Sequence, residues 1–132
     1  MDIFKFAKQY ADQIGGQFTD YDHTKAIMVV PLTEGRFQTV LLLLEKGKTS
    51  GNLRARLTSK ICEFSSSINV QELLEHTGRF DYSKFILDEG HLKVEASCLA
   101  ETASEDEIKH MVQEVANLAD TYEKKITGKD IH

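Results

Sequence analysis

Apolar residues occupy both faces of one short stretch of the chain, residues 37–44 (FQTVLLLL). Split at the two-residue period of a β-strand, one face carries Phe37, Thr39, Leu41 and Leu43, and the other carries Gln38, Val40, Leu42 and Leu44. Apolar residues on both faces are typical of a strand that is covered on both sides. The pattern therefore predicts a central strand over residues 36–46, and it raises the question of what covers the strand's second face.

The segment after it, residues 53–63, alternates in the manner of a strand with one buried face. One face carries Leu53, Ala55, Leu57, Ser59 and Ile61, and the other carries Arg54, Arg56, Thr58, Lys60 and Cys62. We expect the first face to lie in the core and the second face to be wet or charged. Residues 47–52, between these two strands, are interpreted as a flexible hairpin loop.

Shorter strands are predicted at residues 17–20, 25–32, 84–87 and 91–99, each bounded by a turn. Pro31 lies near the end of the second of these segments. Proline has no backbone N–H to donate to a neighbouring strand, so it indicates a sheet edge or a strand end at this position.

Two helices are predicted from apolar residues at three- and four-residue spacing. The first covers residues 3–14, with Asp2 as its N-cap and a pair of glycines, Gly15 and Gly16, where it ends. The second is short, because it begins after the capping residue Asn69 and ends near His76.

The last element is a long amphipathic helix over residues 105–126. It begins with a capping box at Ser104 to Glu107, whose acidic residues suit the positive end of the helix dipole. At a rise of 1.5 Å per residue it is about 33 Å long, which spans a sheet of five strands. Gly128 ends the helix, and residues 128–132 are expected to form a frayed tail.

The order is thus helix, three or four strands, short helix, two strands and long helix. Strands joined by short turns pair antiparallel, and helices gathered at the ends of such runs favour an α+β fold. The sequence predicts a single α+β domain over residues 1–132, with an antiparallel sheet of about five strands. The N-terminal, short middle and long C-terminal helices are expected mainly on one face of that sheet.

The composition of the chain indicates a globular domain, and its charge indicates which partners are not expected. The chain has 132 residues, of which 41% are hydrophobic and 28% are charged, which is ordinary for one globular domain. Its net charge is −5, so it repels phosphate backbones, and we expect neither a nucleic acid nor an anionic membrane as its partner. The N-terminus shows no secretory signal and no run is long enough to span a bilayer, so a cytoplasmic location with reduced thiols is expected.

A few residues suggest chemistry, but none of them forms a complete catalytic signature. Asp20, Asp22 and His23 lie in one turn and could ligate a metal ion, although the sequence places no third or fourth ligand beside them. Residues 47–51 (GKTSG) lack the spacing of a phosphate-binding loop.

The two cysteines, Cys62 and Cys98, are 36 residues apart and do not form a disulfide framework. We expect them to be small buried thiols on strands, while a catalytic cysteine would need a base such as His91 or His110 beside it. The sequence thus predicts no enzyme, no cofactor and no metal. One alternative is a small-molecule-binding or enzymatic domain that uses the Asp20–His23 turn or Cys62, and another is a structural subunit of a larger assembly.

The excess of apolar residues on the central strand predicts a protein interface. We assign Phe37, Thr39, Leu41 and Leu43 to the helix-covered face, which leaves Val40, Leu42 and Leu44 on the face away from the helices. Exposed apolar patches of this kind usually mark a dimer or peptide interface. The alternatives are that the assignment of the two faces is reversed or that a loop covers these residues. Arg54 and Arg56 lie beside them and complete the predicted surface; they are either solvated, paired with Glu45 across the hairpin, or a basic strip for an acidic peptide.

The order of elements resembles the type III secretion chaperone-like superfamily, which includes CesT-type chaperones and YbjN-type proteins. The likeness covers nearly the whole chain and is most specific over residues 73–120. That region is similar to the YbjN pattern in its short helix, its Asp88-Glu89-Gly90 turn, its acid-rich helix cap and its Ala119-Asp120 pair. The resemblance implies a homodimer that binds a partner polypeptide and has no enzymatic activity.

Overall fold

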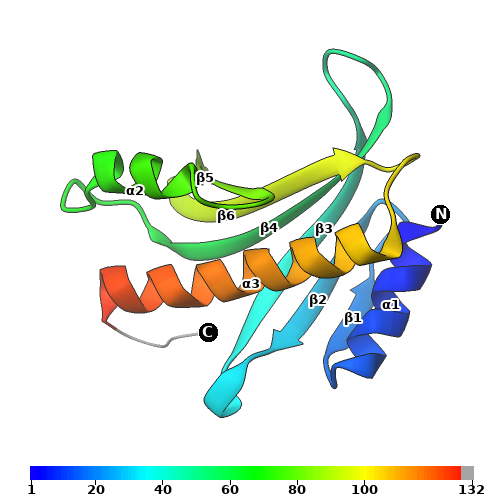
Figure 1. The fold of residues 1–132 in the computed structure, drawn as a ribbon, viewed down its shortest axis with the longest axis horizontal. Coiled ribbons are helices and arrows are strands. Elements are labelled where there is room, and N and C mark those ends of the chain that lie inside the picture. The colour runs from blue at the N-terminus through cyan, green and yellow to red at the C-terminus, as the bar shows by residue number, and fades with distance from the viewer. Residues whose placement is uncertain (129–132) are drawn as a thin grey trace.

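The computed structural model describes residues 1–128, which form an antiparallel sheet and three α-helices (Figure 1). The helices are α1 (Ile3–Gln13), α2 (Val70–Thr77) and α3 (Glu105–Thr127). The strands are β1 (Gln17–Asp20), β2 (Lys25–Pro31), β3 (Phe37–Lys46), β4 (Leu53–Glu63), β5 (Ser83–Asp88) and β6 (His91–Leu99), and a short 3-10 turn, η1 (Thr33–Gly35), joins β2 to β3. The predicted α+β class is confirmed.

The sheet has six strands, in the order β1-β2-β3-β4-β6-β5, where the sequence predicted about five. The smallest of the six is β1, which is largely exposed yet pairs along its whole length with β2, from Gln17 opposite Val29 to Asp20 opposite Ala26. This strand is held mainly by its backbone hydrogen bonds to β2 and less by burial of its side chains. Its pattern of apolar and polar residues is therefore only a weak indication of a strand. Pro31 is the last residue of β2, which confirms the predicted strand end.

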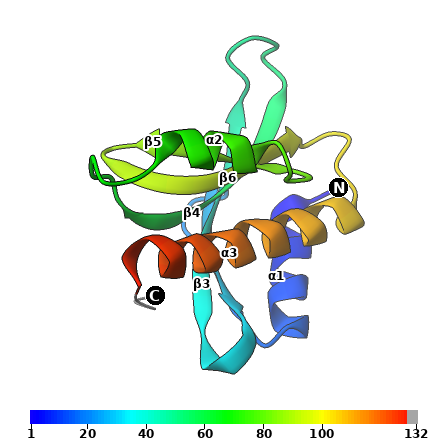
Figure 2. The ribbon, with the colours of Figure 1, turned by 60° about the vertical axis from the view of Figure 1, so that its left-hand side comes forward.

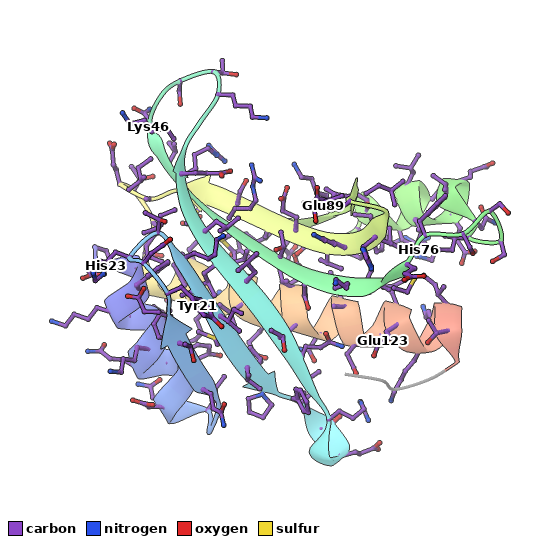
Figure 3. All side chains as sticks on the ribbon, turned by 180° about the vertical axis from the view of Figure 1, so that it is seen from behind. Tyr21, His23, Lys46, His76, Glu89 and Glu123 are labelled. Carbon is purple, nitrogen blue, oxygen red and sulfur yellow. The ribbon has the colours of Figure 1, made fainter. Side chains whose placement is uncertain are left out.

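The helices lie on one face of the sheet (Figures 1 and 2). Helix α3 crosses the strands from β3 to β6, α1 lies over β1 and β2, and α2 lies beside the edge strand β5. Fully buried side chains from both layers form the core, among them Met28, Val40, Leu42, Leu57, Ile61, Ile108, Met111 and Val112. No helix of residues 1–128 covers the opposite face of the sheet, which we call the open face; Figure 3 looks onto it.

The predicted helix caps are present. The side chains of Asp2, Asn69 and Ser104 each accept a hydrogen bond of 3.1 Å from the backbone N–H three residues later. These bonds satisfy donors that a helix N-terminus leaves without partners. Helix α3 ends at Gly128, whose left-handed φ of 69° suits glycine. Of the tail predicted over residues 128–132, residues 129–132 lie outside the described part of the chain.

The turn between α1 and β1 needs both of its glycines, for different reasons. Gly15 has a left-handed φ of 75°. Gly16 lies so close to β2 that a Cβ atom on it would be 2.2 Å from the carbonyl oxygen of Val29. The glycine pair therefore both ends α1 and lets β1 begin directly against β2.

Glu114 of α3 anchors the loop that leads into β5. Its carboxylate accepts backbone hydrogen bonds from Asp81 at 2.9 Å and Tyr82 at 2.8 Å. Partial burial raises the pKa of Glu114, but the nearby Ser83 and the backbone hydrogen bonds from Asp81 and Tyr82 outweigh it and lower the pKa below its usual 4.5. A lowered pKa in the folded state means that the ionised form stabilises the fold.

We expect Glu114→Gln to lower the free energy of unfolding by about 1–2 kcal/mol at neutral pH, since the hydrogen bonds to a charged acceptor are lost. Because the folded pKa is depressed, this difference is fully present above the unfolded value of 4.5 and disappears as the pH falls through the folded pKa. Urea denaturation of both proteins across this pH range measures it, with Glu101→Gln in an exposed turn as control. A difference between Glu114→Gln and wild type that does not change with pH would contradict this role.

Candidate protein-binding surface

The structure reverses the predicted faces of β3. Val40 and Leu42 are 0% and 1% exposed and lie in the core under the helices, and Leu44 packs against the same core. The prediction that these three residues lie on the face away from the helices is therefore wrong. The two faces of β3 are both apolar, so its own sequence does not decide which one the helices cover.

The pairing register between β3 and β4 decides which face of β3 the helices cover. Leu42 lies opposite Leu57 and Leu44 lies opposite Ala55, so the core face of β4 continues into the even-numbered residues of β3. From the sequence alone, the polar residue Gln38 suggests that its face of β3 is exposed to solvent. In the structure Gln38 is only 1% exposed, and its side-chain oxygen accepts a hydrogen bond of 3.2 Å from the Ser59 hydroxyl. A polar residue on a strand thus belongs to the core here.

The open face carries the other set of β3 side chains and has an apolar half. This half spans β2 and β3 and consists of Ile27, Val29, Pro31, Phe37, Thr39, Leu41 and Leu43. Phe37 is 44% exposed, and the aliphatic side chains of Ile27, Leu41 and Leu43 are only half-buried by their neighbours. The open face of β3 therefore does carry an excess of apolar residues, but they are its odd-numbered residues and not the even-numbered residues that we predicted.

Beside the apolar half, β4, β5 and β6 give the open face a charged half. Arg56 pairs with Glu45 at 2.5 Å and with Glu95 at 3.2 Å, and Lys84 reaches Glu95 at 3.5 Å. The predicted pairing of this basic strip with Glu45 across the hairpin is thus confirmed for Arg56. Arg54 instead donates a hydrogen bond of 3.1 Å to the Ser97 hydroxyl. Both arginines lie on the open face, as the sequence indicated.

A shallow hollow lies where the two halves meet. Its volume is about 400 Å³, and it is lined by Ile27, Thr39, Leu41, Thr58, Lys60 and Lys93. Three adjacent strands provide its floor, since Ile27 pairs with Leu41 and Leu41 pairs with Thr58. The hollow is the natural place on this face for an apolar side chain of another molecule.

A second apolar surface lies at the other end of the sheet, around α2. We call it the α2 patch and define it by Phe64, Val70, Leu74 and Leu87, which are 38%, 43%, 65% and 55% exposed. Together with Leu73, Phe85, Ile86 and Leu92 they line a hollow of about 240 Å³. We did not predict this surface from the sequence. Its signal is that Val70, Leu73 and Leu74 make the apolar side of a two-turn helix wider than contact with β5 requires.

The Asp20–His23 turn is held by its own hydrogen bonds. Asp20 accepts one of 2.9 Å from the His23 backbone, and Asp22 accepts two from Thr24, at 3.0 Å from its N–H and 2.7 Å from its hydroxyl. The hydrogen bond from the Thr24 hydroxyl is the main cause that lowers the pKa of Asp22. Within residues 1–128, no group of three or more histidine, cysteine, aspartate or glutamate side chains lies close enough to hold a metal ion.

Cys62 and Cys98 are free, half-buried thiols on β4 and β6. Burial raises the pKa of both thiols, and the negative charges of Glu123 for Cys62 and of Glu107 for Cys98 raise them further. A reactive cysteine needs the opposite shift, toward the thiolate. These environments therefore favour structural thiols over nucleophiles.

Comparisons with known proteins bear on the fold. No protein-family model and no curated protein sequence matches this chain. Four chains of solved structures match it, and one of them belongs to the crystal structure of the ExsC–ExsE complex. That likeness has a TM-score of 0.62 at 19% identity, and it covers 92% of this chain and 91% of the other.

At such low identity the likeness concerns the arrangement of elements, which matches the order found along this sequence. In the described part of the chain, no helix is both long and apolar enough to cross a membrane. The fold of this chain is therefore similar to that of a chain from the ExsC–ExsE complex, which supports the type III secretion chaperone-like fold that its order of elements predicts.

Proposed function

We propose that this chain is a non-enzymatic, chaperone-like protein-binding module, which acts as a homodimer and holds a partner polypeptide on the open face. The observation that carries the proposal is the apolar half of that face, which no helix of residues 1–128 covers. Apolar surface of this extent usually marks an interaction site. The likeness to a chain from a complex of two proteins supports a protein as the partner, and the YbjN-like pattern of residues 73–120 supports the same class.

The two apolar surfaces suit two different roles. The α2 patch is apolar throughout, and obligate homodimer interfaces resemble a hydrophobic core cut in half. The open face mixes apolar side chains with ion pairs, as surfaces that bind and release partners do. We therefore assign the α2 patch to a second copy of the chain, packed about a two-fold axis, and the open face to the partner.

The experiment separates these roles with one substitution in each surface. By light scattering coupled to gel filtration, the wild type should have twice the chain mass of 14.9 kDa. Leu74→Asp should be a folded monomer, because the exposed α2 patch would carry a charge at its centre. Gln71→Asp places the same charge on an exposed position of the same helix and should remain a dimer.

Leu41→Asp should stay dimeric and lose the partner, which is measured by affinity capture from the native host with the wild type beside it. The proteins captured by the wild type should be absent with Leu41→Asp and present with Asn117→Asp, a control at an exposed position of α3 on the helical side of the sheet. A monomeric wild type would contradict the homodimer. Capture of the same proteins by wild type and Leu41→Asp would contradict a partner on the open face.

A further inference from the structure

The open face is cationic although the chain as a whole has a net charge of −5. The register places more cations than carboxylates on this face: Lys25, Arg54, Arg56, Lys60, Lys84 and Lys93 against Glu45, Glu63, Asp88 and Glu95. An acidic protein that collects its cations on one uncovered face creates a local positive potential there. Such a potential attracts a negatively charged group on a partner.

Three of the four carboxylates of the face are already engaged, and the fourth, Glu63, is exposed at the end of β4. Glu45 and Glu95 pair with Arg56, Glu95 also pairs with Lys84, and Asp88 holds Lys93 at 2.9 Å. Within residues 1–128, Arg54 and Lys60 form no ion pair, and Lys60 is exposed. Lys25, at the start of β2, likewise forms no ion pair within residues 1–128. Three cations on the open face thus keep their charge available to another molecule.

Lys60 also lies directly opposite Lys93 in the β4–β6 ladder. Like charges at directly opposite positions destabilise an antiparallel pair, and Asp88 compensates only Lys93. Both lysines line the hollow of about 400 Å³, whose floor includes Ile27 and Leu41. The hollow therefore joins an apolar floor to a cationic wall, a combination that fits an apolar side chain next to a carboxylate.

We infer that the partner segment on the open face is an extended polypeptide that combines apolar residues with aspartate or glutamate. One apolar side chain occupies the hollow, a carboxylate beside it contacts Lys60, and a second carboxylate contacts Arg54. Lys60 lies six positions after Arg54 on β4, which is about 20 Å along a strand, so an extended segment of about seven residues spans the two cations. The inference rests on the proposed function and specifies the chemistry of the partner.

A nucleic acid is the competing source of negative charge. Its phosphates would meet the cations, but they offer nothing to the apolar floor, and the net charge of −5 repels a polyanion. A peptide with two or three carboxylates gains the local attraction without that long-range repulsion. The observations therefore favour an acidic peptide.

The test selects binding peptides from a phage-displayed library of random 12-residue peptides on the immobilised wild-type protein. The selected peptides, labelled with fluorescein, are titrated against wild type, Leu41→Asp and the double variant Lys60→Glu with Arg54→Glu. The control Lys8→Glu makes the same charge reversal on α1, on the other side of the sheet. Titrations at two salt concentrations and with an oligothymidylate complete the set.

We expect acidic and apolar residues to be enriched in the selected peptides. The double charge reversal should weaken their binding at least about tenfold, because like charges then face each other across the interface. Lys8→Glu should have no such effect, and peptides whose carboxylates are replaced by lysine should bind the double variant better than wild type. Higher salt should weaken the wild-type complex.

Other outcomes overturn the inference in distinguishable ways. Peptides that depend on Leu41 but bind the double charge-reversal variant as tightly as wild type would remove the acidic partner and leave the proposed function intact. If the peptides bind Leu41→Asp as tightly as they bind the wild type, both the acidic partner and the proposed function are wrong. If the wild type binds the oligothymidylate and the double charge reversal abolishes that binding, the partner of the open face is a nucleic acid and not a peptide.

Discussion

Leu42→Asp should unfold the protein, while Leu41→Asp, one residue earlier on the same strand, should leave it folded. Leu42 is 1% exposed in the core between β3 and α3. A carboxylate buried there without a partner costs more than about 4 kcal/mol, which is a large part of the stability of a typical domain, about 5–15 kcal/mol. Leu41 is half-buried on the open face, where the new carboxylate keeps its contact with water.

Circular dichroism and urea denaturation of the two variants measure this difference. We expect Leu41→Asp to lose about 1 kcal/mol, the usual cost of a poor strand residue at a partly exposed position. Leu42→Asp should give either no cooperative transition or insoluble protein. The reverse result, a stable Leu42→Asp and an unfolded Leu41→Asp, would show that the helices cover the other face of β3.

Asp120→Ala should cost about 2–3 kcal/mol of folding free energy. The Asp120 carboxylate accepts hydrogen bonds from Arg36 Nε at 3.2 and 3.3 Å, and these side chains are 7% and 16% exposed. The pair ties the η1 end of β3 to α3, which are far apart in the sequence. Removing one partner of a buried pair leaves the other charge desolvated, and that penalty exceeds the value of the bond itself.

Glu34→Gln is the matched control, because Glu34 pairs with the same arginine at 2.8 Å but is 81% exposed. It should cost less than about 1 kcal/mol, as exposed ion pairs do. Thermal and urea unfolding of both variants give the comparison. Equal losses for Asp120→Ala and Glu34→Gln would mean that the buried position of Asp120 contributes nothing, and our account of this contact would be wrong.

Much of the fold follows from local signals that do not depend on distant parts of the chain. The caps at Asp2, Asn69 and Ser104 and the stop at Gly128 are read directly from residue type, and each forms the contact expected of it. The alternation of β4 is equally clear, because only one of its faces is apolar. These elements define the α+β class without knowledge of their packing.

The location of the binding surface depends on contacts that a single sequence does not show. Both faces of β3 are apolar, and only its pairing with β4, Leu42 opposite Leu57, fixes which of them the helices cover. A shift of one residue exchanges every side chain between the two faces of a strand. The prediction therefore recognised the excess of apolar residues on β3 and placed Arg54 and Arg56 on the face away from the helices, but it put Val40, Leu42 and Leu44 on the wrong face.

The α2 patch shows a second limit. Val70 and Leu74 look like ordinary core residues of an amphipathic helix, and such residues are normally buried by the rest of the domain. Here α2 lies at the edge of the sheet beside β5, where the chain provides too little surface to cover both Leu73 and Leu74. Whether an apolar helical face is buried depends on where the helix packs, and that is set by the whole topology.

The central claim, a partner polypeptide on the open face, is tested most directly by photo-cross-linking in cells that make this chain naturally. The photoreactive residue p-benzoylphenylalanine replaces Thr39, which lines the hollow of the open face, or Asn117, which is exposed on α3. Irradiation should join the Thr39 variant to a partner polypeptide and should leave the Asn117 variant without one. Cross-links from Asn117 and none from Thr39 would contradict the claim, because the partner would then lie on the helical side.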